Sequence, residues 1–252
     1  MKSIQVKGGN FKSLRAGIPK NLLPTSLKGL SNLLIADKFN GQYIINSVQP
    51  NDAYLPDNEA GRSYDYPTRN PSGTFGDKEA LLYERETSTN GSYLRVPLYL
   101  SGAFTITVAF AITGSETSSQ CPISGHSDNG VDYFKLGFVP SWDQEYIIDS
   151  NILGESTEMF SPETILFAPE VITITQDIGG TKIYRKGDIE VFSSEEMVIP
   201  SLEYINIGGR SPVESSFTPL RGFVPYLSTY DRKLNSDEVL DVYNQLSNYY
   251  SI

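Results

Sequence analysis

Residues 126–132, HSDNGVD, contain the side chains best suited to binding a metal ion. Asp128, Asn129 and Asp132 offer three side-chain oxygens in one short stretch, and closely spaced oxygen donors in a loop can bind calcium. The dipeptide Asn129-Gly130 is also typical of a hairpin turn with solvated acids. The turn is the favoured interpretation, because calcium takes about six to eight oxygen ligands and this stretch supplies fewer.

Aromatic side chains beside polar ones form a candidate binding site for a sugar or a protein. Trp142 is the only tryptophan of the chain, and Asp143 and Tyr146 follow it closely. An exposed tryptophan flanked by polar groups would be a platform for a sugar or an anchor at an interface. A buried tryptophan would instead belong to the core, and the sequence does not separate the two interpretations.

A second aromatic group lies in the proline-rich stretch 49–78, which is long for a loop in a compact domain. Tyr64 and Tyr66 alternate there with charged residues, a combination that suits sugar stacking or a protein contact. The alternative is that the rings only hold this loop against the rest of the protein, and that alternative is slightly favoured.

The sequence does not support a histidine-rich zinc site or a serine-histidine-aspartate triad. His126 is the only histidine, so either site would have to be built around it. Ser124 and Ser127 are its neighbours in sequence, and neighbours in a loop rarely form a triad. Cys121 is the only cysteine, which excludes an internal disulfide and is typical of a packed thiol.

These candidates must be positioned by β-strands, because alternating patterns dominate the chain. In residues 104–112 the large side chains point one way and alanine and threonine point the other. The large face predicts a core between two sheets, and the small face predicts that another element lies close over it. Similar strands are predicted in residues 33–48, 133–139, 171–192 and 202–209. The predicted fold class is an all-β antiparallel sandwich.

The C-terminal segment 222–246 predicts a strand covered on both faces, a polar corner and one short amphipathic helix. Asn235 and Glu238 fit a capping box, so the helix is predicted over residues 236–246. Pro225 removes one hydrogen-bond donor from the strand and predicts an edge or a bulge at that point.

Residues of this closing segment resemble the last motif of laminin-G-like domains. They are Gly222, Val224, Leu227, Tyr230-Asp231-Arg232, Leu234, Glu238-Val239 and Tyr243. The strands predicted from residue 80 onward resemble earlier strands of the same family, which belongs to the concanavalin A-like lectin/glucanase superfamily. The resemblance implies a jelly-roll β-sandwich with one short C-terminal helix. The sequence departs from the family pattern at two positions. Pro225 lies inside the strand, and Tyr226 replaces a residue that is commonly acidic in the family.

The resemblance also bears on catalysis. Glucanases of this superfamily carry acids in the pattern E-x-D-x-E, which places three carboxylates on one sheet face. The nearest match is KGDIE, in which Lys186 replaces the first acid before Asp188 and Glu190. We therefore expect no enzymatic activity and no required cofactor, although calcium could be bound. The alternative is a glycan hydrolase with an unrecognised site.

The N-terminal residues differ from the rest in charge. The chain has 252 residues and a formal net charge of -10, but residues 1–36 contain basic residues and no acidic one. The opening SIQVKGGNF resembles the leader of tailed-phage virion proteins. This resemblance implies a docking arm over residues 1–36, a sandwich over residues 37–252, and a homo-oligomeric virion module that attaches to other virion proteins or to host-surface polysaccharide. The alternative to a docking arm is a basic flap that packs on the acidic sandwich. The alternative to a virion module is a carbohydrate-binding module unrelated to phages.

The same sequence features oppose other partners and locations. The acidic balance opposes binding to nucleic acid, and no apolar run is long enough for membrane insertion. The N-terminus lacks the apolar stretch of a secretory signal, so we expect synthesis in the host cytoplasm and a final location in the virion.

Overall fold

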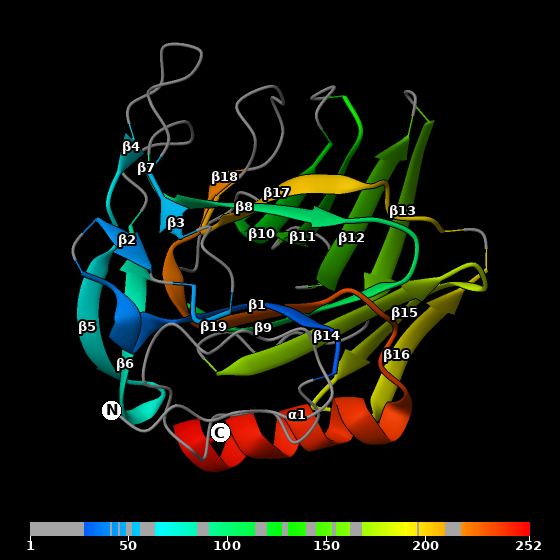
Figure 1. The fold of residues 1–252 in the computed structure, drawn as a ribbon. Coiled ribbons are helices and arrows are strands. Elements are labelled where there is room, and N and C mark those ends of the chain that lie inside the picture. Colours follow the sequence, from blue (N-terminus) through cyan, green and yellow to red (C-terminus); the bar gives the residue numbers. More distant parts are fainter. Residues whose placement is uncertain are drawn as a thin grey trace.

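The computed structural model describes residues 28–40, 42–44, 46–48, 52–55, 64–84, 91–113, 120–127, 131–139, 145–152, 155–161, 168–195, 197–209 and 218–252. Two large β-sheets face each other, and the helix α1 (Ser236–Tyr250) lies beneath one of them (Figure 1). The predicted all-β antiparallel sandwich with one C-terminal helix is confirmed.

The eight-stranded sheet has the order β16, β15, β14, β9, β19, β6, β5, and β1 also pairs with β19. Its strands are β1 (Leu30–Ile35), β5 (Thr68–Gly73), β6 (Gly76–Tyr83), β9 (Phe104–Ile112), β14 (Glu170–Asp177), β15 (Gly180–Arg185), β16 (Ile189–Ser194) and β19 (Gly222–Tyr230). All of its strand pairs are antiparallel.

The nine-stranded sheet has the order β13, β12, β11, β10, β17, β8, β3, β2, and the short β18 pairs with β10. Its strands are β2 (Tyr43–Ile44), β3 (Ala53–Tyr54), β8 (Leu94–Leu100), β10 (Gln120–His126), β11 (Tyr133–Val139), β12 (Glu145–Ile152), β13 (Glu155–Ser161), β17 (Leu202–Ile207) and β18 (Thr218–Pro219). A 3-10 turn (Ala36–Lys38) follows β1, and β4 (Tyr64–Asp65) pairs separately with β7 (Gly91–Ser92).

The core lies between the two large sheets. The large side chains of β9, such as Phe104 and Phe110, pack in one cluster with Leu136, Ile148 and Ile205 of the facing sheet. These side chains are at most 1% exposed, as expected for the inner faces of a sandwich. The alternation in residues 104–112 is therefore confirmed.

The element that covers the small face of β9 is α1. Ala109 and Ala111 lie in a second cluster with Val239, Val242 and Leu246 of the helix. Small side chains on the sheet let the helix approach closely, which explains the alternation of large and small residues in β9. The helix ends one turn later than the predicted residue 246, and Ser251 closes it in a left-handed conformation.

The predicted capping box is present. The backbone N–H of Glu238 donates to Oδ1 of Asn235, and the backbone N–H of Asn235 donates to Oε2 of Glu238, both at 3.0 Å. Two otherwise unpaired donors at the helix start are thereby satisfied.

Pro225 lies at a bulge, as predicted, but in a central strand rather than at an edge. The pairing of β19 with β9 shifts register between Phe223 and Tyr226. On its other side β19 pairs with β6 up to Val224 and with β1 from Tyr226 onward. Pro225 occupies the point where the partner changes, so its missing N–H costs no ladder hydrogen bond there.

The predicted boundary between arm and sandwich at residue 36 must be corrected. Strand β1 (Leu30–Ile35) pairs with the second half of β19, and its side chains are almost entirely buried. A buried side-chain network holds it, because Asn46 Nδ2 donates to Asn32 Oδ1 at 2.7 Å and Asn46 Oδ1 accepts from the Leu33 N–H. The sandwich therefore includes Leu30 to Ala36. The boundary at residue 36 was drawn from the absence of acidic residues, and this charge pattern does not indicate a strand. Residues 1–27 lie outside the described residues.

Candidate functional site

Four of the eight residues predicted to form sites fall outside the part of the chain that the structure describes. Trp142, Asp143, Asp128 and Asn129 lie outside it. Tyr64 and Tyr146 belong to strands β4 and β12. The two candidate loops leave β11 at its opposite ends, because one precedes Tyr133 and the other follows Val139. A strand of this length separates its ends by about 20 Å, so the topology does not join the two loops at their bases.

Asp132 is described, and its backbone closes a hairpin. The N–H of Ser127 donates to the carbonyl oxygen of Asp132 at 3.0 Å, and the Ser127 hydroxyl donates to the same oxygen at 3.1 Å. This pairing agrees with the turn interpretation of residues 126–132. Among the described residues, no three His, Cys, Asp or Glu side chains lie close enough to hold a metal ion.

Tyr66 is 41% exposed and borders a surface hollow of about 530 Å³. The other lining residues are Phe39, Asn40, Pro67, Thr68 and Arg69. Arg69 also forms an ion pair with Glu79 of β6. The structure therefore places Tyr66, one of the predicted site residues, at a surface hollow.

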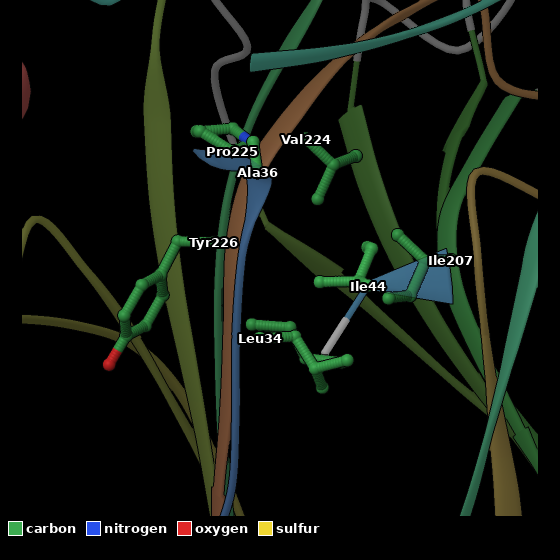
Figure 2. Close-up of a pocket in the computed structure, with 8 residues that line it drawn as sticks. Leu34, Ala36, Ile44, Ile207, Val224, Pro225 and Tyr226 are labelled. Atoms are coloured by element: carbon green, nitrogen blue, oxygen red, sulfur yellow. The ribbon is translucent and has the colours of Figure 1, made fainter. Parts of the chain in front are cut away.

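A second hollow, near Pro225, is a packing void. Leu34, Ile44, Ile207 and Val224 point toward one another there, and the Tyr226 ring points away (Figure 2). Its volume of about 10 Å³ is at the lower limit for one water molecule, and its lining side chains are apolar. It therefore results from the β19 bulge and offers no binding chemistry.

The richest polar cluster lies on the nine-stranded sheet, on the face that points away from the core, which we call the outer face. One row crosses six strands in register: Tyr54, Arg95, Asn206, Ser124, Lys135 and Asp149. A parallel row contains Pro97, Tyr204, His126, Tyr133 and Asn151. Alternate residues of the same strands, such as Ile123 and Ile205, belong to the core.

Five of these residues form a stack of rings and cations, which we call the ladder. The Arg95 guanidinium lies over the Tyr204 ring, 4.2 Å from its centre, and His126 stacks on Tyr204 at 5.2 Å. His126 is 6.1 Å from the Tyr133 ring, and the Lys135 Nζ lies 4.4 Å from the centre of Tyr133. The ladder runs across β8, β17, β10 and β11. Its members Arg95, Tyr204 and Tyr133 are half-buried, and His126 and Lys135 are at most 2% exposed.

Hydrogen bonds hold the inner side of the ladder. Arg95 Nε donates to Asn206 Oδ1 at 3.1 Å, and Asn206 Nδ2 donates to Ser124 Oγ at 3.5 Å. The Ser124 hydroxyl donates to the Gly209 carbonyl oxygen, and His126 Nε2 lies 3.3 Å from Ser124 Oγ. A proton on Nε2 of His126 would let this nitrogen donate to Ser124 Oγ and satisfy the network. Ser124 is thus arranged as a structural acceptor and not as an activated nucleophile.

The stretch nearest to the glucanase pattern lies elsewhere. Lys186 and Gly187 form the turn between β15 and β16, with φ of 53° and 78°. A Cβ at Gly187 would lie 2.5 Å from the Cβ of Tyr243, because the turn packs against α1. Lys186 and Asp188 therefore lie in a turn of the eight-stranded sheet and not on the outer face of the nine-stranded sheet.

Sequence reasoning missed the ladder. The signal was present, since Ser124 and His126 in β10, and Tyr204 and Asn206 in β17, are each separated by one small or apolar residue. The register between strands far apart in the chain was needed to bring Arg95, His126 and Tyr204 together.

No protein-family model and no curated protein matches the sequence. Among solved structures, domain 4 of the extracellular GH43 arabinanase AbnA from Geobacillus stearothermophilus, in complex with arabinotriose, has a TM-score of 0.61 and 18% identity. The match covers 84% of this chain and 97% of that chain. This chain shares its β-sandwich fold.

Two other solved structures support the same fold. Trypanosoma rangeli sialidase in complex with sialic acid has a TM-score of 0.59 and 16% identity over 87% of this chain, which spans 33% of the sialidase. A structure of botulinum neurotoxin type C, whose cell entry depends on interaction with two ganglioside molecules, has a TM-score of 0.60 and 12% identity. The match covers 86% of this chain and 51% of that one. At such identities the likeness shows the fold alone. Within the described residues, no helix has the length and apolar content needed to span a membrane.

Proposed function

We propose that this protein is a non-enzymatic carbohydrate-binding module whose ligand lies on the outer face of the nine-stranded sheet. The observation that carries the proposal is the ladder. It holds a guanidinium and two tyrosine rings in fixed positions across neighbouring strands, and Arg95, Tyr204 and Tyr133 are each half-buried. Groups fixed in advance lose little freedom on binding, which favours affinity for a ligand rich in hydroxyls.

A flat apolar surface is available on the same face. Tyr99 follows Arg95 and Pro97 at alternate positions of β8, so it points to the same side, and it is 71% exposed. Sugars bind best where such a ring face accompanies hydrogen-bonding groups, because hydroxyls alone exchange water for protein with little net gain. Tyr99 provides the ring face, and Arg95 and Tyr204 of the ladder provide the hydrogen-bonding groups.

The ligands of the similar proteins support this class of ligand. The arabinanase domain is in complex with arabinotriose, the sialidase with sialic acid, and the toxin is described with ganglioside molecules. These facts concern those proteins, and they motivate the choice of ligands to test here.

The finer proposal is a tail or capsid-associated module of a phage virion that binds host-surface polysaccharide or attaches the particle structurally. Its support is the N-terminal leader SIQVKGGNF and the basic charge of the segment before β1. That segment would dock to other virion proteins, and the module would act as a homo-oligomer. No cofactor is required, and Asp128, Asn129 and Asp132 are the residues to test for calcium.

The test is titration calorimetry with arabinotriose, sialyllactose and bacterial surface polysaccharides. Tyr99→Ala should weaken binding about tenfold, which is about 1.4 kcal/mol, and Tyr204→Phe should weaken it by removing one hydroxyl. Tyr249→Ala is the matched control, because Tyr249 lies on α1 under the opposite sheet. Melting curves check the fold of each variant.

Two further variants locate the site. Trp142→Ala and Asp128→Ala test the loops that sequence reasoning singled out. If Trp142→Ala abolishes binding while Tyr99→Ala and Tyr204→Phe bind like the parent, the outer-face site is wrong. Loss of binding in Asp128→Ala together with sensitivity to EDTA would place calcium in the site. Failure of every glycan to bind would leave the structural attachment role.

A further inference from the structure

Lys135 and Asp149 form an ion pair that is almost completely buried. Nζ of Lys135 lies 2.9 Å from Oδ2 of Asp149, and the two side chains are 2% and 6% exposed. They stand directly opposite each other on the antiparallel strands β11 and β12. Removing two charges from water costs several kcal/mol per ion, so such a pair is weak evidence for stability and calls for another explanation.

The carboxylate of Asp149 is held by hydroxyl groups on both of its oxygens. Ser156 Oγ donates to Oδ1 at 2.8 Å, and the Tyr133 hydroxyl donates to Oδ2 at 3.3 Å. The Tyr133 ring also lies against the Lys135 Nζ. The amine is thus placed beside a carboxyl group whose two oxygens each face a donor, which is the arrangement that stabilises negative charge developing on the oxygens of a tetrahedral intermediate.

We propose that Lys135 and Asp149 condense into an intramolecular isopeptide bond. The Lys135 ammonium first passes one proton to Oδ2 of Asp149, which frees the lone pair of Nζ. Nζ then attacks Cγ and forms the C–N bond of a tetrahedral intermediate, whose two oxygens accept from the hydroxyls of Ser156 and Tyr133. The intermediate collapses when a second hydrogen moves from Nζ to Oδ2 and the bond from Cγ to Oδ2 breaks. Two of the three ammonium hydrogens thus leave with Oδ2 as water, and the third stays on the amide nitrogen. Ammonium and carboxylate become amide and water, so no oxidant, reductant or other reactant is required.

Two physical effects drive the reaction at this pair. Well-oriented groups within one molecule reach effective concentrations of about 10⁵ to 10⁸ M, which offsets the unfavourable condensation in water. The product is also neutral, so the cost of burying two charges disappears. Tyr133 can pass a proton to the departing oxygen, because its hydroxyl already donates to Oδ2.

The chain contains its own control. Lys233 Nζ lies 2.9 Å from Asp177 Oδ2, the same separation, but these side chains are 28% and 33% exposed. Water solvates both charges there, so nothing is gained by forming an amide. We expect Lys233 and Asp177 to remain an ordinary ion pair.

The experiment is intact-mass spectrometry of the purified full chain, followed by digestion with chymotrypsin, which cleaves after Trp142 and Tyr146 between the two positions. The wild-type mass should be lower than the sequence mass by one water, and a linked peptide pair should contain Lys135 and Asp149. Lys135→Met and Asp149→Ala should restore the full sequence mass. Tyr133→Phe should leave the link incomplete, because the proton donor is lost while the ring remains.

The wild-type measurement decides the proposal without any variant. A full sequence mass, with Lys135 and Asp149 recovered in unlinked peptides, overturns it and leaves a buried ion pair. A loss of water located at any other pair, including Lys233 and Asp177, overturns it as well.

Discussion

Tyr250, the last residue of α1, donates its hydroxyl hydrogen to the carbonyl oxygen of Pro225 at 3.2 Å. The contact joins the end of the helix to the bulge where β19 exchanges one partner strand for another. The Tyr250 ring is also fully buried and packs edge-on against Phe75. The last turn of the helix, which the sequence pattern did not predict, is therefore held by a tertiary contact.

Tyr250→Phe should lower the free energy of unfolding by about 1 kcal/mol, the usual net value of one hydrogen bond. Tyr250→Ala should cost about 3–5 kcal/mol, because it also leaves a cavity. Urea unfolding followed by circular dichroism measures both. Tyr249→Ala serves as the comparison, since Tyr249 is only half-buried. Equal losses in Tyr250→Ala and Tyr249→Ala would contradict the anchoring role.

Removal of residues 1–27 should leave a folded sandwich, because β1 and its partners are retained. Removal of residues 1–36 should unfold the protein or lower its unfolding free energy by several kcal/mol, because it deletes β1 and the Asn32 contact to Asn46. This outcome differs from the one expected from charge composition. Thermal melts of both truncated proteins give the measurement. Equal melting temperatures would show that β1 is not part of the sandwich core. If the arm docks to a larger assembly, the shorter truncation should already abolish attachment.

Incubation with bacterial surface polysaccharides and plant β-glucans should release no reducing ends. The reason is that Lys186 replaces the first acid of the glucanase pattern, and its stretch lies in a turn against α1. Turnover that disappears in Asp188→Asn or Glu190→Gln would show that the protein is a hydrolase after all.

Stability should fall steeply above about pH 10. Burial raises the pKa of Tyr83, of Tyr226 and of Tyr230 well above the usual value of 10.0 for tyrosine. Their stabilising contribution is therefore complete below pH 10, and it is lost at higher pH as the unfolded chain releases protons that the folded chain retains.

Each such tyrosine contributes at most about 1.4 kcal/mol per pH unit above that point. Urea midpoints between pH 8 and 12 measure the slope, and Tyr83→Phe and Tyr226→Phe should make it shallower. An unchanged slope in both variants would argue against these two residues as the cause.

The sequence alone determined the features that depend on neighbouring residues. The alternation in β9, the capping box of Asn235 and Glu238, and the bulge at Pro225 each follow from local spacing or from a missing donor. The fold class followed from the same patterns, because large and small faces and a covered C-terminal strand are compatible with few arrangements.

Only the tertiary structure decided the ladder, the buried Lys135–Asp149 pair and the place of β1. Arg95, His126 and Tyr204 come from three separate segments, and they meet only because β8, β17 and β10 pair in one register. A shift of that register by one residue would turn each of them to the other face. Burial of β1 likewise depends on β19, nearly 200 residues later in the chain, so a basic N-terminal composition could not reveal it.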